Sequence, residues 1–182
     1  SKTPGRTQQI NFFRLRDGAL LADLPGYGYA AVPQDLKRHW QEFLARYLAT
    51  RQSLVGLALV VDARHGLAEL DRQLLGGYLT SGRPVLLLAT KMDKFAVSGQ
   101  REAKRVIERD VAAAFPAHVA QVAVVPFSAT RRIGIETAEA MLDRLDSLAA
   151  RFDEPDRSIF QPQFRLALAI ARSQVALARH QV

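Results

Sequence analysis

Three short groups of polar and small residues have the types and spacing that phosphate and purine chemistry needs. Each comes directly after a run of apolar residues that predicts a strand. In chain order they are Asp23-Leu-Pro-Gly26, Thr90-Lys-Met-Asp93 and Phe127-Ser-Ala129. Ligands of open α/β sheets bind at the carboxyl ends of the strands. The order of the three groups therefore predicts one ligand site at one edge of a sheet.

The first group suits a metal-bound phosphate. Asp23 can hold Mg²⁺ through a water molecule, because Mg²⁺ keeps much of its hydration shell in proteins. Gly26 lets its backbone N–H approach a terminal phosphate with no Cβ in the way. Loss of that phosphate would release the loop that follows, which is a common switch. D-x-x-G also occurs by chance, and an ordinary turn at the end of a strand is the alternative interpretation.

The second and third groups suit recognition of a guanine base. The Asp93 carboxylate, placed against the base edge, accepts hydrogen bonds from N1–H and from the 2-amino group. Adenine lacks this pair of donors, and a buried acceptor left unpaired costs about 1–3 kcal/mol. The Lys91 stem would cover the base or close the loop beneath it, and small residues at Ser128 and Ala129 leave backbone N–H groups open to the 6-oxo group. The alternative for Asp93 is a helix cap in solvent.

A fourth candidate is the segment Thr3-Pro-Gly-Arg-Thr-Gln8. A threonine hydroxyl on a loop can complete a Mg²⁺ shell when a γ-phosphate is bound, and Thr7 is the residue we expect to do so. The alternative is a flexible terminal segment.

Alternating strands and helices are predicted to position these groups. Runs that are apolar on both faces alternate with helical patterns, which is typical of a three-layer α/β fold with a mostly parallel sheet. Asp17-Gly18 predicts a hairpin that adds one antiparallel strand at the edge. The predicted strands are 9–15, 19–24, 55–61, 85–89 and 121–127, and the predicted helices are 34–49, 68–80, 100–115, 134–152 and 163–178.

Composition narrows the class of protein. The chain of 182 residues is 48% apolar and 24% charged, which fits one soluble domain with one core. It has no cysteine, which excludes disulfides and thiolate metal sites and suits a reducing cytoplasm. Its longest apolar runs are too short to span a bilayer, so no membrane partner is expected. The net charge of +7 favours a polyanion such as RNA, with a generally basic surface as the alternative.

Four longer strings carry a family resemblance. They are Ser1-Lys-Thr-Pro-Gly-Arg-Thr-Gln8, Ile10-Asn-Phe-Phe13, Asp23-Leu-Pro-Gly-Tyr-Gly-Tyr-Ala30 and Thr90-Lys-Met-Asp-Lys94. Together they resemble the EngB (YihA/YsxC) family of TrmE–Era–EngA–EngB–Septin-like GTPases, and the string beginning at Asp23 is unusually specific. The resemblance covers 1–153 and implies a G domain with the P-loop GTPase fold. Residues 154–182 are expected to form a C-terminal extension, a linker followed by a helix.

The resemblance also implies a ligand and a set of contacts. Mg²⁺ would be held at Thr7 and Asp23, with GTP or GDP as the ligand. No side chain is assigned as catalytic: Tyr27 follows D-x-x-G where many GTPases have a glutamine that orients water, so slow hydrolysis is expected. The implied phosphate contacts are Gly5, Arg6, Thr7, Gln8, Asp23, Leu24, Pro25 and Gly26, and the implied guanine contacts are Thr90, Lys91, Met92, Asp93, Phe127, Ser128 and Ala129.

The implied cellular role is in assembly of the large ribosomal subunit. Contact with ribosomal RNA, a requirement in cell division and septation, and a cytoplasmic location follow from the same resemblance. The oligomeric state stays open. The alternative function is an RNA- or ribosome-binding module that does not use nucleotide.

One family motif is missing from the sequence. The phosphate-binding loop G-x-x-x-x-G-K-[ST] occurs nowhere in the chain, and by resemblance it lies upstream of Ser1 with the first strand. Its amides and lysine hold the β- and γ-phosphates, so we expect little tight nucleotide binding without it. By resemblance the first strand is central, between the strand ending at Asp23 and the one starting near Val55, and its absence would open two strand edges.

Three explanations stay open for the missing motif. They are residues that precede Ser1 in the full protein, a shortened chain and a segment swapped from a neighbour, and the first two are favoured. The helix predicted over 163–178 has an apolar stripe that would cover exposed sheet.

Overall fold

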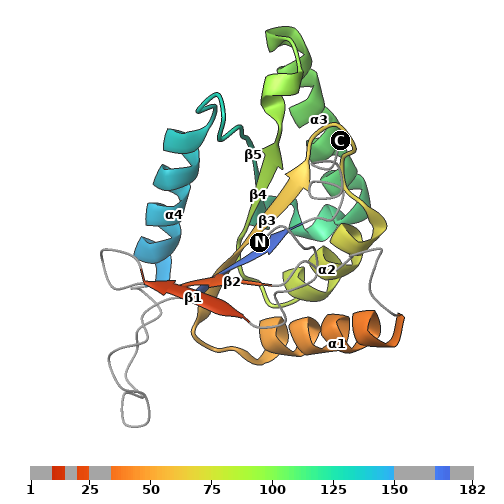
Figure 1. Cartoon of the computed structure of the whole chain (residues 1–182), viewed down its shortest axis with the longest axis vertical. Coiled ribbons are helices and arrows are strands. Elements are labelled where there is room, and N and C mark those ends of the chain that lie inside the picture. The colour runs from red at the N-terminus through yellow and green to blue at the C-terminus, as the bar shows by residue number, and fades with distance from the viewer. Residues whose placement is uncertain (1–9, 15–19, 25–33, 150–166, 173–182) are drawn as a thin grey trace.

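A computed structural model describes residues 10–14, 20–24, 34–149 and 167–172 (Figure 1). The strands are β1 (Asn11–Arg14), β2 (Leu20–Asp23), β3 (Leu54–Asp62), β4 (Val85–Thr90), β5 (Val122–Pro126) and β6 (Ala167–Arg172). The α-helices are α1 (Gln34–Thr50), α2 (Glu69–Leu79), α3 (Val97–Ala114) and α4 (Ile135–Ala149), and the 3-10 helices are η1 (Met92–Lys94) and η2 (Pro116–Gln121). The five predicted strands and the first four predicted helices are all present.

The strands form one sheet in the order β1-β2-β6-β3-β4-β5. β1 pairs antiparallel with β2, with Phe12 opposite Ala22, so the edge hairpin is confirmed. All other neighbouring strands pair parallel. The predicted α/β class, with a mostly parallel sheet and one antiparallel edge, is therefore confirmed.

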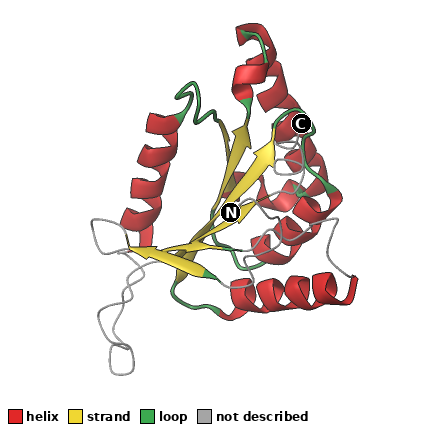
Figure 2. Cartoon of the chain, in the orientation of Figure 1, coloured by secondary structure: helices red, strands yellow, loops and turns green. Residues whose placement is uncertain are grey.

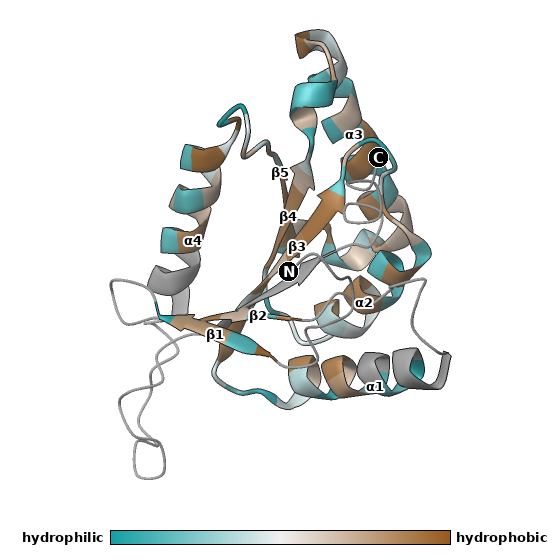
Figure 3. Cartoon of the chain, in the orientation of Figure 1, coloured by the Kyte–Doolittle hydropathy of each residue, from teal (hydrophilic) through white to brown (hydrophobic). Residues whose placement is uncertain are grey.

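Helices cover both faces of the sheet, as Figure 2 shows: α4 lies on one side, and α1, α2 and α3 lie on the other. Alternation along β3 explains the two layers of core. Leu57 and Leu59 are fully buried in the large cluster on the side of α1 to α3, whereas Ala58 packs with Leu142 of α4. A strand that is apolar on both faces needs a helix on each side. Figure 3 shows the apolar colouring concentrated on β3 and β4.

The predicted helix over 163–178 is wrong over Ala167–Arg172, which forms β6. β6 lies in the interior of the sheet: Ala169 is opposite Ala22 of β2 and Leu57 of β3. Alternating Ala, Leu and Ile suit either structure when read locally, and here the backbone pairs on both sides of the strand, which outweighs the helix preference of alanine.

β6 fills the place in which the sequence suggested an open gap, between β2 and β3. Its backbone pairs with strands on both sides, so neither β2 nor β3 has an open edge there. The division of the chain after residue 153 stays a prediction. Among the described residues, no helix combines the length and the apolar character needed to cross a membrane.

Candidate functional site

The candidate site lies at the edge of the sheet where the parallel strands end. β2 ends at Asp23, opposite Ile170 of β6, and β3 ends at Asp62, opposite Thr90 at the end of β4. Because β2, β6, β3, β4 and β5 run in the same direction, their carboxyl ends share one edge. The described parts of the three motifs therefore lie at the same edge of the sheet.

Two of the predicted base-reading residues are in direct contact. The Ser128 hydroxyl donates a hydrogen bond of 2.6 Å to Oδ1 of Asp93. Ser128 is buried and its Oγ also accepts from the backbone N–H of Arg131 at 3.3 Å. The hydrogen bond from Ser128 is the main cause that lowers the pKa of Asp93, and Lys94, whose Nζ lies 3.6 Å from Oδ2, adds to it. Asp93 is thus a charged, oriented acceptor at neutral pH.

Asp93 does not cap a helix. It lies inside the short helix η1, where Lys91 is the residue preceding the first turn, and α3 begins after Ala96. Neither helix start has a side-chain capping hydrogen bond. The helix-cap interpretation of Asp93 is therefore wrong.

Backbone and hydroxyl hydrogen bonds tie the two base-side loops to the strands. The Thr90 hydroxyl donates to the Val61 carbonyl at 2.7 Å. The Met92 N–H donates to the Phe127 carbonyl at 3.2 Å, and the Phe127 N–H donates to the Ala89 carbonyl at 2.8 Å. Met92 is fully buried. Thr90, Met92 and Phe127 therefore hold the loops in place, and the side chain of Met92 is not at the surface.

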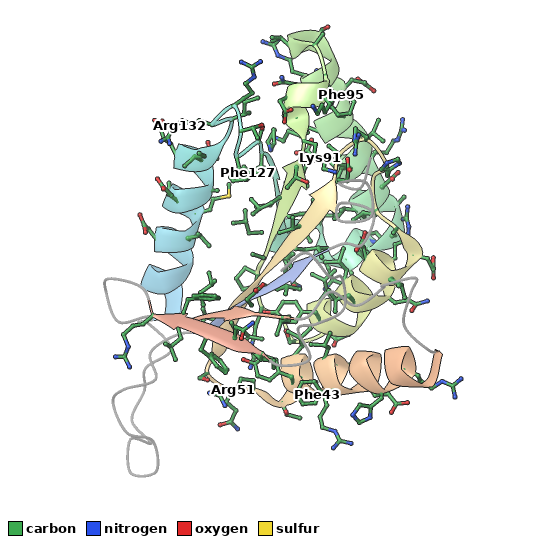
Figure 4. All side chains as sticks on the ribbon, in the orientation of Figure 1. Phe43, Arg51, Lys91, Phe95, Phe127 and Arg132 are labelled. Atoms are coloured by element: carbon green, nitrogen blue, oxygen red, sulfur yellow. The ribbon has the colours of Figure 1, made fainter. Side chains whose placement is uncertain are left out.

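The loop after β5 closes on itself. Ser128 and Ile133 exchange two backbone hydrogen bonds of 3.0 Å. Gly134 follows with φ +71°, and a Cβ there would overlap the carbonyl oxygen of Pro126. Ala129 is exposed within this closed loop. Figure 4 shows Lys91, Phe127 and Arg132 toward the same end of the sheet.

The sequence reasoning missed two charged residues at this edge, Asp62 and Arg64. Asp62 is buried, and its carboxylate accepts from Arg64 Nε at 2.9 Å and from Arg64 Nη2 at 2.6 Å. Lys91 Nζ lies 3.2 Å from Oδ2 of the same carboxylate. Asp62 is an aspartate at the end of an apolar strand, which is the same pattern that identified Asp23. The sequence alone could therefore have indicated Asp62.

The phosphate side of the site is only partly described. Asp23 stands at the end of β2, and Leu24 is buried in the main core, so only the backbone of Leu24 can face a ligand. A single carboxylate ligand, that of Asp23, is enough for a Mg²⁺ ion that is held mainly by phosphate and water. Among the described residues no three His, Cys, Asp or Glu side chains form a metal cluster. The predicted residues Gly5, Arg6, Thr7, Gln8, Pro25 and Gly26 lie outside the described residues.

Comparison with known proteins places the chain in a family. A sequence model described as 50S ribosome-binding GTPase matches residues 1–91. A probable GTP-binding protein EngB of Aromatoleum aromaticum is 48% identical over 139 residues, which is 76% of this chain and 62% of that protein. One of Methylobacillus flagellatus is 42% identical over 156 residues, 86% of this chain and 73% of that protein.

The chain spans less than two thirds of the length of several relatives, 62% for Aromatoleum aromaticum and 66% for an Azoarcus species. Solved structures agree on the fold. The crystal structure of a probable GTP-binding protein engB has a TM-score of 0.62 at 17% identity, covering 80% of this chain and 86% of that one. Elongation factor SelB of Methanococcus maripaludis has a TM-score of 0.55 at 12% identity, covering 75% and 27%. On the strength of the sequence matches, the chain belongs to the EngB family of GTP-binding proteins.

Proposed function

We propose that this chain acts as a guanine-nucleotide-dependent switch of the EngB type, in which Asp93 and the loop of Ser128 recognise the base. The observation that supports this most directly is the 2.6 Å hydrogen bond between Ser128 and Asp93, at the edge where β2 ends in Asp23. Two motifs that are 35 residues apart in sequence meet there.

Guanine selectivity follows from the state of the Asp93 carboxylate. Its lowered pKa keeps it ionised, and an ionised carboxylate is only an acceptor. Guanine offers two donors on one edge, whereas adenine leaves the acceptor unpaired at a cost of about 1–3 kcal/mol. That cost corresponds to a preference for guanine of about 5- to 150-fold.

Mg²⁺ and the phosphates belong to the other half of the proposed site. When bound, Mg²⁺ neutralises charge on the phosphate oxygens. Asp23 would hold it through water and Thr7 would contact it directly when a γ-phosphate is present. The sequence contains no G-x-x-x-x-G-K-[ST] loop, so residues 1–182 should bind nucleotide weakly, chiefly through the base. Hydrolysis is expected to be slow, because Tyr27 stands where many GTPases have a glutamine.

The proposed partner is the large ribosomal subunit, through its RNA. The family model that matches residues 1–91 is described as ribosome-binding, and the chain carries a net charge of +7. A basic protein binds the RNA backbone with an affinity that falls as salt rises. Roles in subunit assembly and in cell division, in the cytoplasm, are part of the same proposal.

A nucleotide titration tests the base-reading role. GDP, ADP and XDP are titrated against the wild type and Asp93→Asn, up to millimolar concentration, with protein NMR as the readout. The wild type should prefer GDP over ADP by about 5- to 150-fold. Asp93→Asn should lose GDP and gain XDP, because the 2-oxo group of xanthine accepts from the new amide. Asp143→Asn, an exposed aspartate of α4, is the matched control and should change neither affinity.

Two results would contradict the proposal. Equal affinity for GDP and ADP in the wild type would remove the base-reading role of Asp93. Binding of ribosomal RNA with no response to any nucleotide would favour the alternative, an RNA-binding module that does not use nucleotide.

A further inference from the structure

The buried carboxylate of Asp62 sits between two cations at the end of β3, and only one of them belongs to a recognised motif. Arg64 donates to Oδ1 through its backbone N–H at 3.0 Å and through Nε at 2.9 Å, and to Oδ2 through Nη2 at 2.6 Å. Lys91, from the loop after β4, approaches Oδ2 to 3.2 Å. The side chain of Asp62 has no exposed surface, while those of Arg64 and Lys91 are 30% and 19% exposed.

We infer that Asp62 is a positioning residue for guanine recognition: by holding Lys91, it fixes the turn that presents Asp93 to the base. The inference rests on the proposed function, because it concerns the same site. Asp62 lies outside the three recognised motifs. The inference also means that Lys91 closes the loop beneath the base and does not cover the face of the base.

The backbone of Lys91 explains why the turn needs an anchor. Lys91 has φ +61° and ψ +30°, a left-handed conformation that is unfavourable for a residue with a side chain. The turn then closes through the Lys94 N–H, which donates to the Lys91 carbonyl at 3.0 Å, and the Phe95 N–H, which donates to the Met92 carbonyl at 3.1 Å. An ion pair to a fixed carboxylate favours the conformation that the backbone alone disfavours.

Charge supports the same arrangement. Burial alone would raise the pKa of Asp62, but the hydrogen bonds from Arg64 and Lys91 outweigh it and lower the pKa to about 2. Asp62 therefore stays ionised at neutral pH. Arg64 holds the carboxylate in one orientation by contacts to both of its oxygens, which leaves Oδ2 aimed at Lys91. Removing the charge of Asp62 leaves two neighbouring cations with no counter-charge between them.

A double-mutant cycle with two readouts tests the inference. The variants are Asp62→Asn, Lys91→Met and the combination of the two. The matched control is Asp110→Asn, whose carboxylate pairs with Arg72 at 3.5 Å at a partly exposed position. The first readout is hydrogen exchange of the Lys94 and Phe95 amides by NMR, which needs no ligand. The second is the affinity for GDP.

We expect Asp62→Asn to speed exchange of these two amides and to weaken GDP binding, each by about tenfold, with similar effects of Lys91→Met. The double variant should be no worse than the more strongly affected of the two single variants, because both substitutions break the same ion pair between Asp62 and Lys91. Asp110→Asn should leave both readouts at the wild-type level. A purely structural role for Asp62 would instead make the losses multiply in the double variant.

The two readouts separate failure of this inference from failure of the proposed function. If the wild type does not bind GDP, the proposed function fails, and the amide exchange still decides whether Asp62 holds the turn. Unchanged exchange in Asp62→Asn would overturn the inference, as would independent effects of the two substitutions. If Asp62→Asn does not fold, unchanged exchange in Lys91→Met alone would overturn it.

Discussion

Gly134 is the position at which a single methyl group should damage the base-reading loop. Its φ of +71° is a left-handed conformation, which costs an alanine about 1–2 kcal/mol. The added Cβ would also overlap the Pro126 carbonyl oxygen and approach the Pro126 carbonyl carbon to 3.1 Å. Both contacts are backbone atoms of β5, so no flexible side chain can give way.

The magnitude of the effect of Gly134→Ala follows from what must move. Relief of the overlap displaces the loop and breaks the two hydrogen bonds between Ser128 and Ile133, each worth about 1 kcal/mol. When the cost of the left-handed conformation for alanine is added, the free energy of unfolding should fall by about 3–4 kcal/mol. Because the same loop holds Ser128 against Asp93, the affinity for GDP should fall as well.

Urea unfolding followed by circular dichroism measures the stability, and an NMR titration measures GDP binding. The matched control is Gly77→Ala, in the last turn of α2 with nothing within 4 Å of its added Cβ. That variant should be more stable than the wild type by about 0.5–1 kcal/mol, because alanine favours a helix over glycine. If the free energy of unfolding of Gly134→Ala lies within about 1 kcal/mol of the wild-type value, the argument from backbone conformation and atomic overlap is refuted.

Three further predictions concern the sheet and its edge. Ala169→Pro removes an N–H from an interior strand and should lower the free energy of unfolding by about 3 kcal/mol or more in the same urea assay; a negligible change would place β6 outside the sheet. Asp62 has a pKa of about 2 in the folded chain and a higher one when unfolded, so its contribution of about 2 kcal/mol is full above about pH 5 and is lost progressively as pH falls through 2. The stability difference between wild type and Asp62→Asn should shrink over that range, and a constant difference would contradict it. Asp23→Ala should weaken GTP more than GDP in the presence of Mg²⁺, measured by competition, and equal losses would remove Asp23 from the metal site.

Local sequence patterns predicted most of the fold. Apolar runs such as 55–61 identify strands buried on both faces, because each face of the sheet is covered by helices. The placement of Asp93 and Ser128 at one edge follows from the fact that parallel strands point their carboxyl ends the same way. These features depend on residues that are close in sequence, or on a general rule of parallel sheets.

β6 was missed because its structure is decided by residues far away in sequence. Its alternating Ala and Leu residues have high helix propensity and also the two-residue period of a strand. Only the presence of β2 on one side and β3 on the other selects the strand. The role of Asp62 was missed for a related reason: a single aspartate after a strand does not reveal that a lysine 29 positions later will reach it.

The interior place of β6 also governs the order in which this protein can fold. β6 is synthesised after the other strands that the structure describes, yet β2 and β3 on its two sides come from the first half of the chain. Until it arrives, β2 and β3 each present an unpaired edge, which invites association with other chains. Closing such a long loop is slow, since contacts distant in sequence delay the rate-limiting step of folding. Among the strands that the structure describes, β6 therefore joins the sheet last, and β2 and β3 can associate with other chains until it does.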